Sequence, residues 1–239
     1  MSDPSHPSEV HSALDDSPLH EAVSAHTAAR INRYLYLAVT LIILGGVGAF
    51  VWLSREEPAP EVEQERLERE AVRGAADTRV EVIQYGAYGC VTCRAEYQGR
   101  QIEQLLMTYE GQVRLVFRNW PRLEDNDPLT AEAAQCALDQ GDDAFWTLHG
   151  ALFSLSHREY LALDSVDEVV GLAAGAGLDT DTLRGCLETN WHRRTVEFWE
   201  ENADARNIRG TPTFFVNGQR ASSVAGIEAI IRQELGLES

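Results

Sequence analysis

The chain has 239 residues, and its 20 basic side chains, all arginine, stand against 38 acidic ones for a formal net charge of −18. This charge excludes a chain-wide grip on nucleic acid, because it repels phosphate, and four cysteines are too few for a disulfide scaffold of this length. The hydrophobic share of 44% predicts a folded chain. The absence of lysine fits codon bias in a GC-rich genome, with a high-salt environment as the alternative.

The first third of the chain divides into three predicted zones. Residues 1–33 are polar and rich in proline and serine, which predicts a disordered tail. Residues 34–53 contain no charge and, as a helix of about 1.5 Å per residue, match the thickness of a bilayer core. We therefore expect a single transmembrane helix there, in contact with lipid. Residues 54–76 carry many charges and predict a solvated linker.

The next segment predicts a strand, a helix and a second strand around two cysteines. Residues 79–85 are rich in β-branched residues, Cys90 and Cys93 follow, and apolar residues then recur at helical spacing before a second strand over 112–120. A Cys-x-x-Cys pair inside a β-α-β pattern is typical of a redox-active dithiol. Half of a zinc site is the alternative, but it needs a second closely spaced pair of ligands.

The position of the pair predicts a different role for each of its two sulfurs. A helix N-terminus lowers the pKa of a thiol, and the thiolate is the attacking species. We expect Cys90 to expose its sulfur and act as the nucleophile. Cys93, one helical turn later, is placed to resolve the mixed disulfide.

A second informative segment is RGTPTFFVNG, residues 209–218. Residues 214–216 predict a strand, and Asn217-Gly218 is a strong hairpin signal. Thr211-Pro212 leads directly into that strand, and X-Pro is the one kind of peptide bond that is commonly cis.

Between Pro128 and Ile208 no strand pattern occurs. Helical patterns are predicted at Leu129–Gln140, Ala144–Leu155, Ser165–Leu178, Thr180–Leu187 and Trp191–Asn207. Residues 226–235 predict a closing amphipathic helix. His149 and His157, within this region, are expected to be surface or packing residues.

Taken in order, these motifs resemble the DsbA-like thiol–disulfide oxidoreductases of the thioredoxin superfamily. The resemblance covers residues 77–239 and implies an α/β thioredoxin-like fold with a helical insertion at about 123–208. It further implies that the Thr211-Pro212 bond is cis and packs beside the active disulfide as a substrate loop. No cofactor and no metal is expected.

The chain departs from that family near the pair. Gln84 stands where the family often has an acidic residue that relays protons, Ala87 replaces a frequent Asp, and Val91-Thr92 separates the two sulfurs. The class of chemistry therefore carries over, whereas its direction and rate do not. Glu81 and Glu96 are alternative proton acceptors.

The other two cysteines, Cys136 and Cys186, lie in the predicted insertion. Some members of the resembling family carry a second bridge at similar places, which implies a structural disulfide. The alternative is two buried free thiols that behave as small apolar side chains.

The function implied is an oxidoreductase that introduces disulfides into reduced or misoxidised secreted and membrane proteins, with a quinone-linked membrane protein as its reoxidising partner. Because disulfides persist in oxidising compartments, we expect residues 1–33 to be cytoplasmic and 54–239 extracytoplasmic, although the arginine count near the predicted span does not favour that orientation. A reductase or isomerase, and a non-catalytic thiol metallochaperone, are the alternatives.

Overall fold

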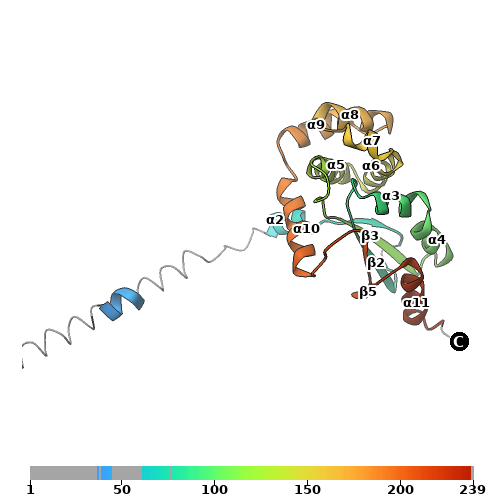
Figure 1. The fold of residues 1–239 in the computed structure, drawn as a ribbon, viewed down its shortest axis with the longest axis horizontal. Helices are drawn as coiled ribbons and strands as arrows, with labels where there is room; N and C mark the ends of the chain where they lie inside the picture. Colours follow the sequence, from blue (N-terminus) through green and yellow to red (C-terminus); the bar gives the residue numbers. More distant parts are fainter. Residues whose placement is uncertain (1–36, 38, 45–60, 76, 238–239) are drawn as a thin grey trace, which may run out of the picture. The chain divides into compact units, whose positions relative to one another are not determined.

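The computed structural model describes residues 37, 39–44, 61–75 and 77–237 of the chain (Figure 1). The chain divides into two units, Met1–Pro58 and Ala59–Ser239. In the first unit the described residues are helical. Within the described parts of the chain, we find no helix with the length and apolar character needed to cross a membrane. The predicted tail 1–33 and most of the predicted span 34–53 lie outside the described residues.

The second unit is built on one five-stranded sheet with the strand order β1-β3-β2-β4-β5. Its strands are β1 (Ala71–Arg73), β2 (Val80–Gly86), β3 (Val113–Asn119), β4 (Thr213–Val216) and β5 (Gln219–Ala221). The two central strands, β2 and β3, run parallel, with Val80 opposite Val113, and the other neighbouring pairs are antiparallel. The expected β-α-β unit and the hairpin at Asn217-Gly218 are both present.

Helices surround this sheet and form a separate group at one end of it (Figure 1). They are α2 (Glu61–Glu68), α3 (Val91–Gln98), α4 (Gln101–Thr108), α5 (Asp127–Asp139), α6 (Asp142–Ser154), α7 (His157–Leu161), α8 (Val166–Gly175), α9 (Thr180–Glu188), α10 (Arg193–Ala205) and α11 (Val224–Glu234). The group α5–α9 contains no strand, as the sequence predicts for the insertion.

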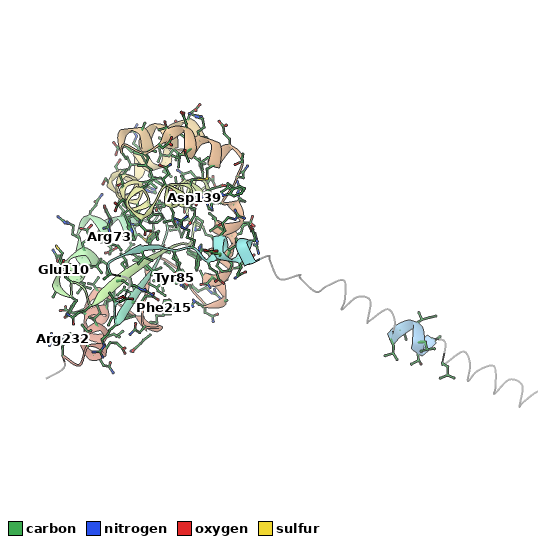
Figure 2. The ribbon with its side chains drawn as sticks, turned by 180° about the vertical axis from the view of Figure 1, so that it is seen from behind. Arg73, Tyr85, Glu110, Asp139, Phe215 and Arg232 are labelled. Carbon is green, nitrogen blue, oxygen red and sulfur yellow. A yellow bond between two sulfur atoms is a disulfide. The ribbon has the colours of Figure 1, made fainter. Side chains whose placement is uncertain are left out.

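Each face of the sheet is covered, because alternate residues of its strands point to opposite sides. Val82 and Val216 belong to the larger core cluster, which also contains residues of α4 and α11. Tyr85 and Phe215, both labelled in Figure 2, belong to a smaller cluster with Ala203 of α10. The sheet is therefore buried on both faces, which holds the end of β2 in place.

Two expectations about the elements need correction. Residues 71–73, which lie in the predicted linker 54–76, pair with β3, and Trp146 Nε1 donates a 3.0 Å hydrogen bond to Val72 O, so the folded domain begins before residue 77. The single helix predicted after the cysteine pair is two helices, because Arg100 has a left-handed backbone with φ 53° between α3 and α4.

Candidate active site

The two cysteines of the Cys-x-x-Cys motif lie where β2 leads into α3. Cys90 is the N-cap of α3 and has an extended backbone, and Cys93 lies in the first turn of the helix. The two are joined by a disulfide, with 5.2 Å between their Cα atoms. The described form of the protein is therefore the oxidised one.

Two backbone groups contact the sulfur of Cys90. The N–H of Cys93 donates a hydrogen bond to Cys90 Sγ at 3.0 Å, and the carbonyl oxygen of Thr211 lies 3.3 Å from the same sulfur. The expectation that Cys90 is exposed is wrong, because the residue is buried with 3% of its surface accessible, against 0% for Cys93. The carbonyl of Thr211 lies against this sulfur.

The Thr211 loop is fixed beside the disulfide by its entry into the sheet. The Thr211–Pro212 peptide bond is cis. The next residue, Thr213, pairs with Tyr85 of β2, and its hydroxyl donates a 2.8 Å hydrogen bond to Gly210 O. Residues more than 110 positions apart in sequence are thus brought together at one end of the sheet.

The turn between β2 and α3 depends on close packing at two glycines. A Cβ on Gly86 would lie 2.7 Å from a ring carbon of Phe117, and a Cβ on Gly89 would lie 2.6 Å from Asp127 Oδ1. The Gly89 N–H instead donates to that carboxylate oxygen at 2.8 Å. This contact ties the turn before Cys90 to the helical insertion.

Asp127 is a buried carboxylate that sequence reasoning missed. It also accepts hydrogen bonds from the N–H groups of Leu123 and Glu124, at 2.9 and 3.0 Å, and from the Tyr160 hydroxyl. An acidic residue before a helical proline is common at helix starts, so no local signal distinguishes it.

Arg94, directly after Cys93, is a second missed residue. It is 6% exposed, and its Nη2 donates to Tyr88 O at 2.9 Å. Its Nε and Nη1 have no hydrogen-bond partner among the described residues. Burial lowers the pKa of Arg94, since removal from water penalises the charged form. A cation at this point lies next to the redox pair in the chain.

The two candidate proton acceptors have different surroundings. Gln84 Nε2 donates a 3.1 Å hydrogen bond to Glu96 Oε2, and burial raises the pKa of Glu96 above its ordinary value. Glu81 instead forms a partly exposed ion pair with Arg114 near the start of β2. Because Cys90 and Cys93 follow the other end of β2, Glu96, on the same helix as Cys93, is the nearer of the two along the chain.

The family model described as thioredoxin matches residues 66–233, most of the chain. The chain belongs to the thioredoxin family. The thioredoxin domain is similar in fold to oxidised BdbD from Bacillus subtilis (24% identity, TM-score 0.63, covering 70% of this chain and 93% of that one). It is also similar to reduced DsbA from Mycobacterium tuberculosis (22% identity, TM-score 0.56, covering 70% and 92%). The expected thioredoxin-like fold with a helical insertion is thus confirmed.

Curated relatives of the thioredoxin domain carry a different name. A Na⁺/H⁺ antiporter NhaA 1 from Salinispora arenicola is 37% identical over 169 residues, which cover 68% of this chain and 24% of the relative. A second, NhaA 3 from Salinispora tropica, is 35% identical with the same coverage. The chain therefore spans about a quarter of the length of these relatives.

His149 lies in an aromatic cluster of the thioredoxin domain that includes Tyr88, two residues before Cys90. Its ring contacts Tyr88, Phe117, Trp146 and Phe153 with centroid separations between 4.6 and 5.6 Å. Burial lowers the pKa of His149 to about 3, so the ring is neutral. His149 is a packing residue, and Tyr88 connects this cluster to the turn before Cys90.

The second cysteine pair of the domain is also joined. A disulfide links Cys136 of α5 to Cys186 of α9, with 5.9 Å between Cα atoms. It lies within the insertion and connects two of its helices, while the Thr211 loop and Cys90 meet at the end of the sheet. The structure thus separates the four cysteines into two pairs.

Proposed function

We propose that this thioredoxin domain catalyses thiol–disulfide exchange, with Cys90 as the attacked sulfur, Cys93 as the resolving thiol, and Thr211-Pro212 as the loop that receives the substrate chain. The observation that carries the proposal is the position of Cys90 Sγ, which accepts the Cys93 N–H at a helix N-terminus and lies 3.3 Å from the Thr211 carbonyl. A helix N-terminus stabilises thiolate, which is the species that both attacks and leaves in exchange.

The direction we propose is oxidation of reduced substrate proteins. A substrate thiolate attacks Cys90 Sγ, the Cys90–Cys93 bond breaks, and Cys93 leaves as thiolate. A second substrate thiolate then attacks the mixed disulfide, so the substrate gains a disulfide and the pair is reduced. Donors and positive charge at the pair favour its reduced form, which makes the disulfide a stronger oxidant. The Cys93 N–H is such a donor, and the buried Arg94 directly follows Cys93 in the chain.

The redox potential of Cys90–Cys93 tests this direction. It is measured by equilibrating the Cys136→Ser/Cys186→Ser variant with glutathione buffers and counting thiols. A value near the DsbA end, about −120 mV, supports an oxidase, and a value near −270 mV supports the alternative of a reductase. Activity in reshuffling a scrambled test protein, with none in oxidising a reduced one, would assign an isomerase.

We further propose that residues 34–53 anchor the domain in the cell membrane, with the redox pair on the extracytoplasmic side. The support is the uncharged apolar run and the need for an oxidising compartment. In intact cells that carry Cys93→Ala, which leaves Cys90 unpaired, a membrane-impermeant thiol reagent should label the chain. Labelling that requires lysed cells would contradict this orientation.

The partners we propose are secreted or membrane proteins with reduced or wrongly paired cysteines, and a quinone-linked membrane protein that reoxidises the pair. The antiporter relatives add a membrane transport protein as a candidate partner, because a similar sequence forms about a quarter of those longer chains. Crosslinking of Cys93→Ala in cells, followed by identification of the disulfide-linked proteins, distinguishes these classes.

A metallochaperone remains the alternative from another class, since two thiolates can bind soft metal ions. Tight Cu(I) binding by the reduced Cys90–Cys93 pair, together with no oxidation of a reduced test protein, would reverse our assignment. Oxidation of that protein, lost in Cys90→Ser, supports it.

A further inference from the structure

A second group of chemically versatile side chains surrounds the Cys136–Cys186 disulfide, away from the redox pair. One ligand atom each from Asp139, Cys186 and His192 lies within 4.8 Å of the other two. Cys136 is not one of these three, but its Sγ is bonded to Cys186 Sγ at 2.00 Å and so lies at the edge of the group. With Cys136 added, the four residues offer two sulfurs, one imidazole nitrogen and one carboxylate oxygen, all of which are ligand types that zinc binds.

Three elements of the insertion and its border bring these side chains together. Cys136 and Asp139 are three residues apart on α5 and therefore share a face of that helix. Cys186 lies on α9, which packs against α5, and His192 is the N-cap of α10. Asp139, labelled in Figure 2, lies at the end of α5. The convergence is a property of the fold and no sequence motif indicates it.

The imidazole of His192 is held on both sides. It is 2% exposed, its Nε2 lies 2.7 Å from Asp139 Oδ2, and its Nδ1 lies 3.2 Å from Thr195 Oγ1. Metal-binding histidines are commonly oriented by such a bond from the second ring nitrogen. Nε2 is thereby held at the Asp139 carboxylate, and one ring nitrogen of His192 lies within 4.8 Å of Cys186 Sγ.

We propose that reduction of the Cys136–Cys186 disulfide creates a zinc site formed by Cys136, Cys186, His192 and Asp139. A dithiol reduces the bond: two electrons and two protons pass to the protein sulfurs, and the dithiol becomes a disulfide. Zn²⁺ then binds both sulfurs as thiolates, and two protons are released. The proton on His192 Nε2 moves to Nδ1, where Thr195 Oγ1 accepts it, so Nε2 is free to bind the metal.

The charges around the site are balanced in the bound form. Two thiolates and one carboxylate exceed the charge of Zn²⁺ by one negative unit. Arg69 supplies the compensating positive charge, because its Nη1 lies 3.2 Å from Asp139 Oδ1, the oxygen that does not contact His192. A buried or half-buried charge is tolerated only with such a partner.

An entry route for the ion is present at Asp139. A surface cavity of about 590 Å³ is lined by Asp139 together with Glu65, Arg66, Glu68 and Arg69. The carboxylate of Asp139 is partly exposed, whereas Cys136 is fully buried. An ion can therefore meet Asp139 first and then the inner ligands.

The disulfide and the metal exclude one another, because the sulfurs of two zinc-bound cysteines lie about 3.7 Å apart and those of a disulfide about 2.0 Å. Bound zinc would hold the thiols of the insertion in the reduced state. The state of the second pair would then depend on whether the chain has been exposed to reducing conditions. This role would be in addition to linking two helices.

The test uses the full chain with Cys90→Ser and Cys93→Ser, so that only the second pair carries thiols. The protein is reduced with dithiothreitol, freed of reductant without air, and titrated with Co²⁺, which gives a sulfur-to-metal absorption band when thiolate binds it. We expect one Co²⁺ per chain in the reduced protein, displacement by Zn²⁺, and no band in the oxidised protein. Histidines near the N-terminus cannot produce this band.

Variants of the proposed ligands show whether Co²⁺ binds to a site formed by all four residues or to the two thiols alone. Asp139→Asn and His192→Ala should each weaken Co²⁺ binding by at least about tenfold, whereas His157→Ala, on α7, should leave it unchanged. Circular dichroism checks that each reduced variant is folded, and if His192→Ala is not, Asp139→Asn decides. A reduced chain without the band, or one whose affinity is the same in Asp139→Asn, would overturn the proposal.

Discussion

Gln84 Nε2 donates a 3.1 Å hydrogen bond to Glu96 Oε2 and so joins β2 to α3 beside the redox pair. Glu96 lies one helical turn after Cys93, and burial raises its pKa above the ordinary value. A carboxyl group with a raised pKa keeps its proton to a higher pH than an ordinary one and can exchange it with a neighbouring thiol. The strand β2 carries the neutral Gln84, so the acidic group at this place comes from Glu96 on α3.

The first prediction concerns catalysis. Glu96→Gln should slow the oxidation of a reduced test protein by at least about tenfold, because the leaving Cys93 thiolate then lacks the carboxyl group that would give it a proton. Rates measured between pH 5 and 9 should also lose a dependence on pH that the parent shows. The matched control is Glu81→Gln, whose carboxylate pairs with Arg114 near the start of β2. Equal losses in both variants would contradict a specific role for Glu96.

A second prediction concerns stability and the same side chain. Since the folded-state pKa of Glu96 lies above its value of 4.5 in an unfolded chain, the folded state binds the proton more tightly. Stability therefore falls as the pH rises from 4.5 through the folded-state pKa. Glu96→Gln should remove this loss. The difference in unfolding free energy between variant and parent should therefore favour the variant more at pH 7 than at pH 4. Urea unfolding at the two pH values measures it, and an unchanged difference would refute the raised pKa.

For His149 we expect the opposite dependence of stability on pH. Its pKa falls from 6.5 to about 3 in the folded state, so the unfolded chain binds more protons between these values and stability decreases as the pH falls below 6.5. At pH 4.5 the loss amounts to roughly 2–3 kcal/mol. His149→Phe should show a smaller loss on going from pH 7 to 4.5 in urea unfolding. Phe145→Leu, in the same cluster, should keep the parent's loss.

Removal of the second disulfide predicts a loss of stability without a loss of exchange chemistry. The bond closes a loop of 50 residues, so the chain-entropy model gives about 4 kcal/mol for Cys136→Ser/Cys186→Ser. Urea unfolding of parent and variant measures this difference. The variant should still oxidise a reduced test protein at a temperature where it is folded. Loss of exchange in a folded variant would show that the second pair takes part in electron transfer.

Local patterns were sufficient for the elements around the redox pair, and long-range contacts were not predictable from them. The β-branched run in residues 79–85 and the Asn217-Gly218 dipeptide each carry a strong local signal. β1 has only three residues inside a charged stretch, so its pairing with β3 depends on the sheet already formed. The left-handed Arg100 breaks a helical pattern that continues through it.

The site shows the same division. Cys90, Cys93 and Thr211-Pro212 stand out by residue type and order. Asp127 and Arg94 are defined by their contacts with the turn before α3, and His192 by its approach to Cys186 from another helix. Their residue types are ordinary in helices, and nothing in the neighbouring sequence marks them. The net charge of −18 and the absence of lysine relate to the environment of the protein more than to the chemistry of the site.

The most direct test of the central claim is to trap the exchange intermediate. Cys93→Ala removes the resolving thiol, so a substrate peptide activated as a mixed disulfide should become attached to Cys90 and stay attached. Mass spectrometry of the digested adduct should place the peptide on Cys90, with Cys136 and Cys186 still joined, and Cys90→Ala should give no stable adduct. A peptide found on Cys136 or Cys186, or on no cysteine of Cys93→Ala, would contradict the account.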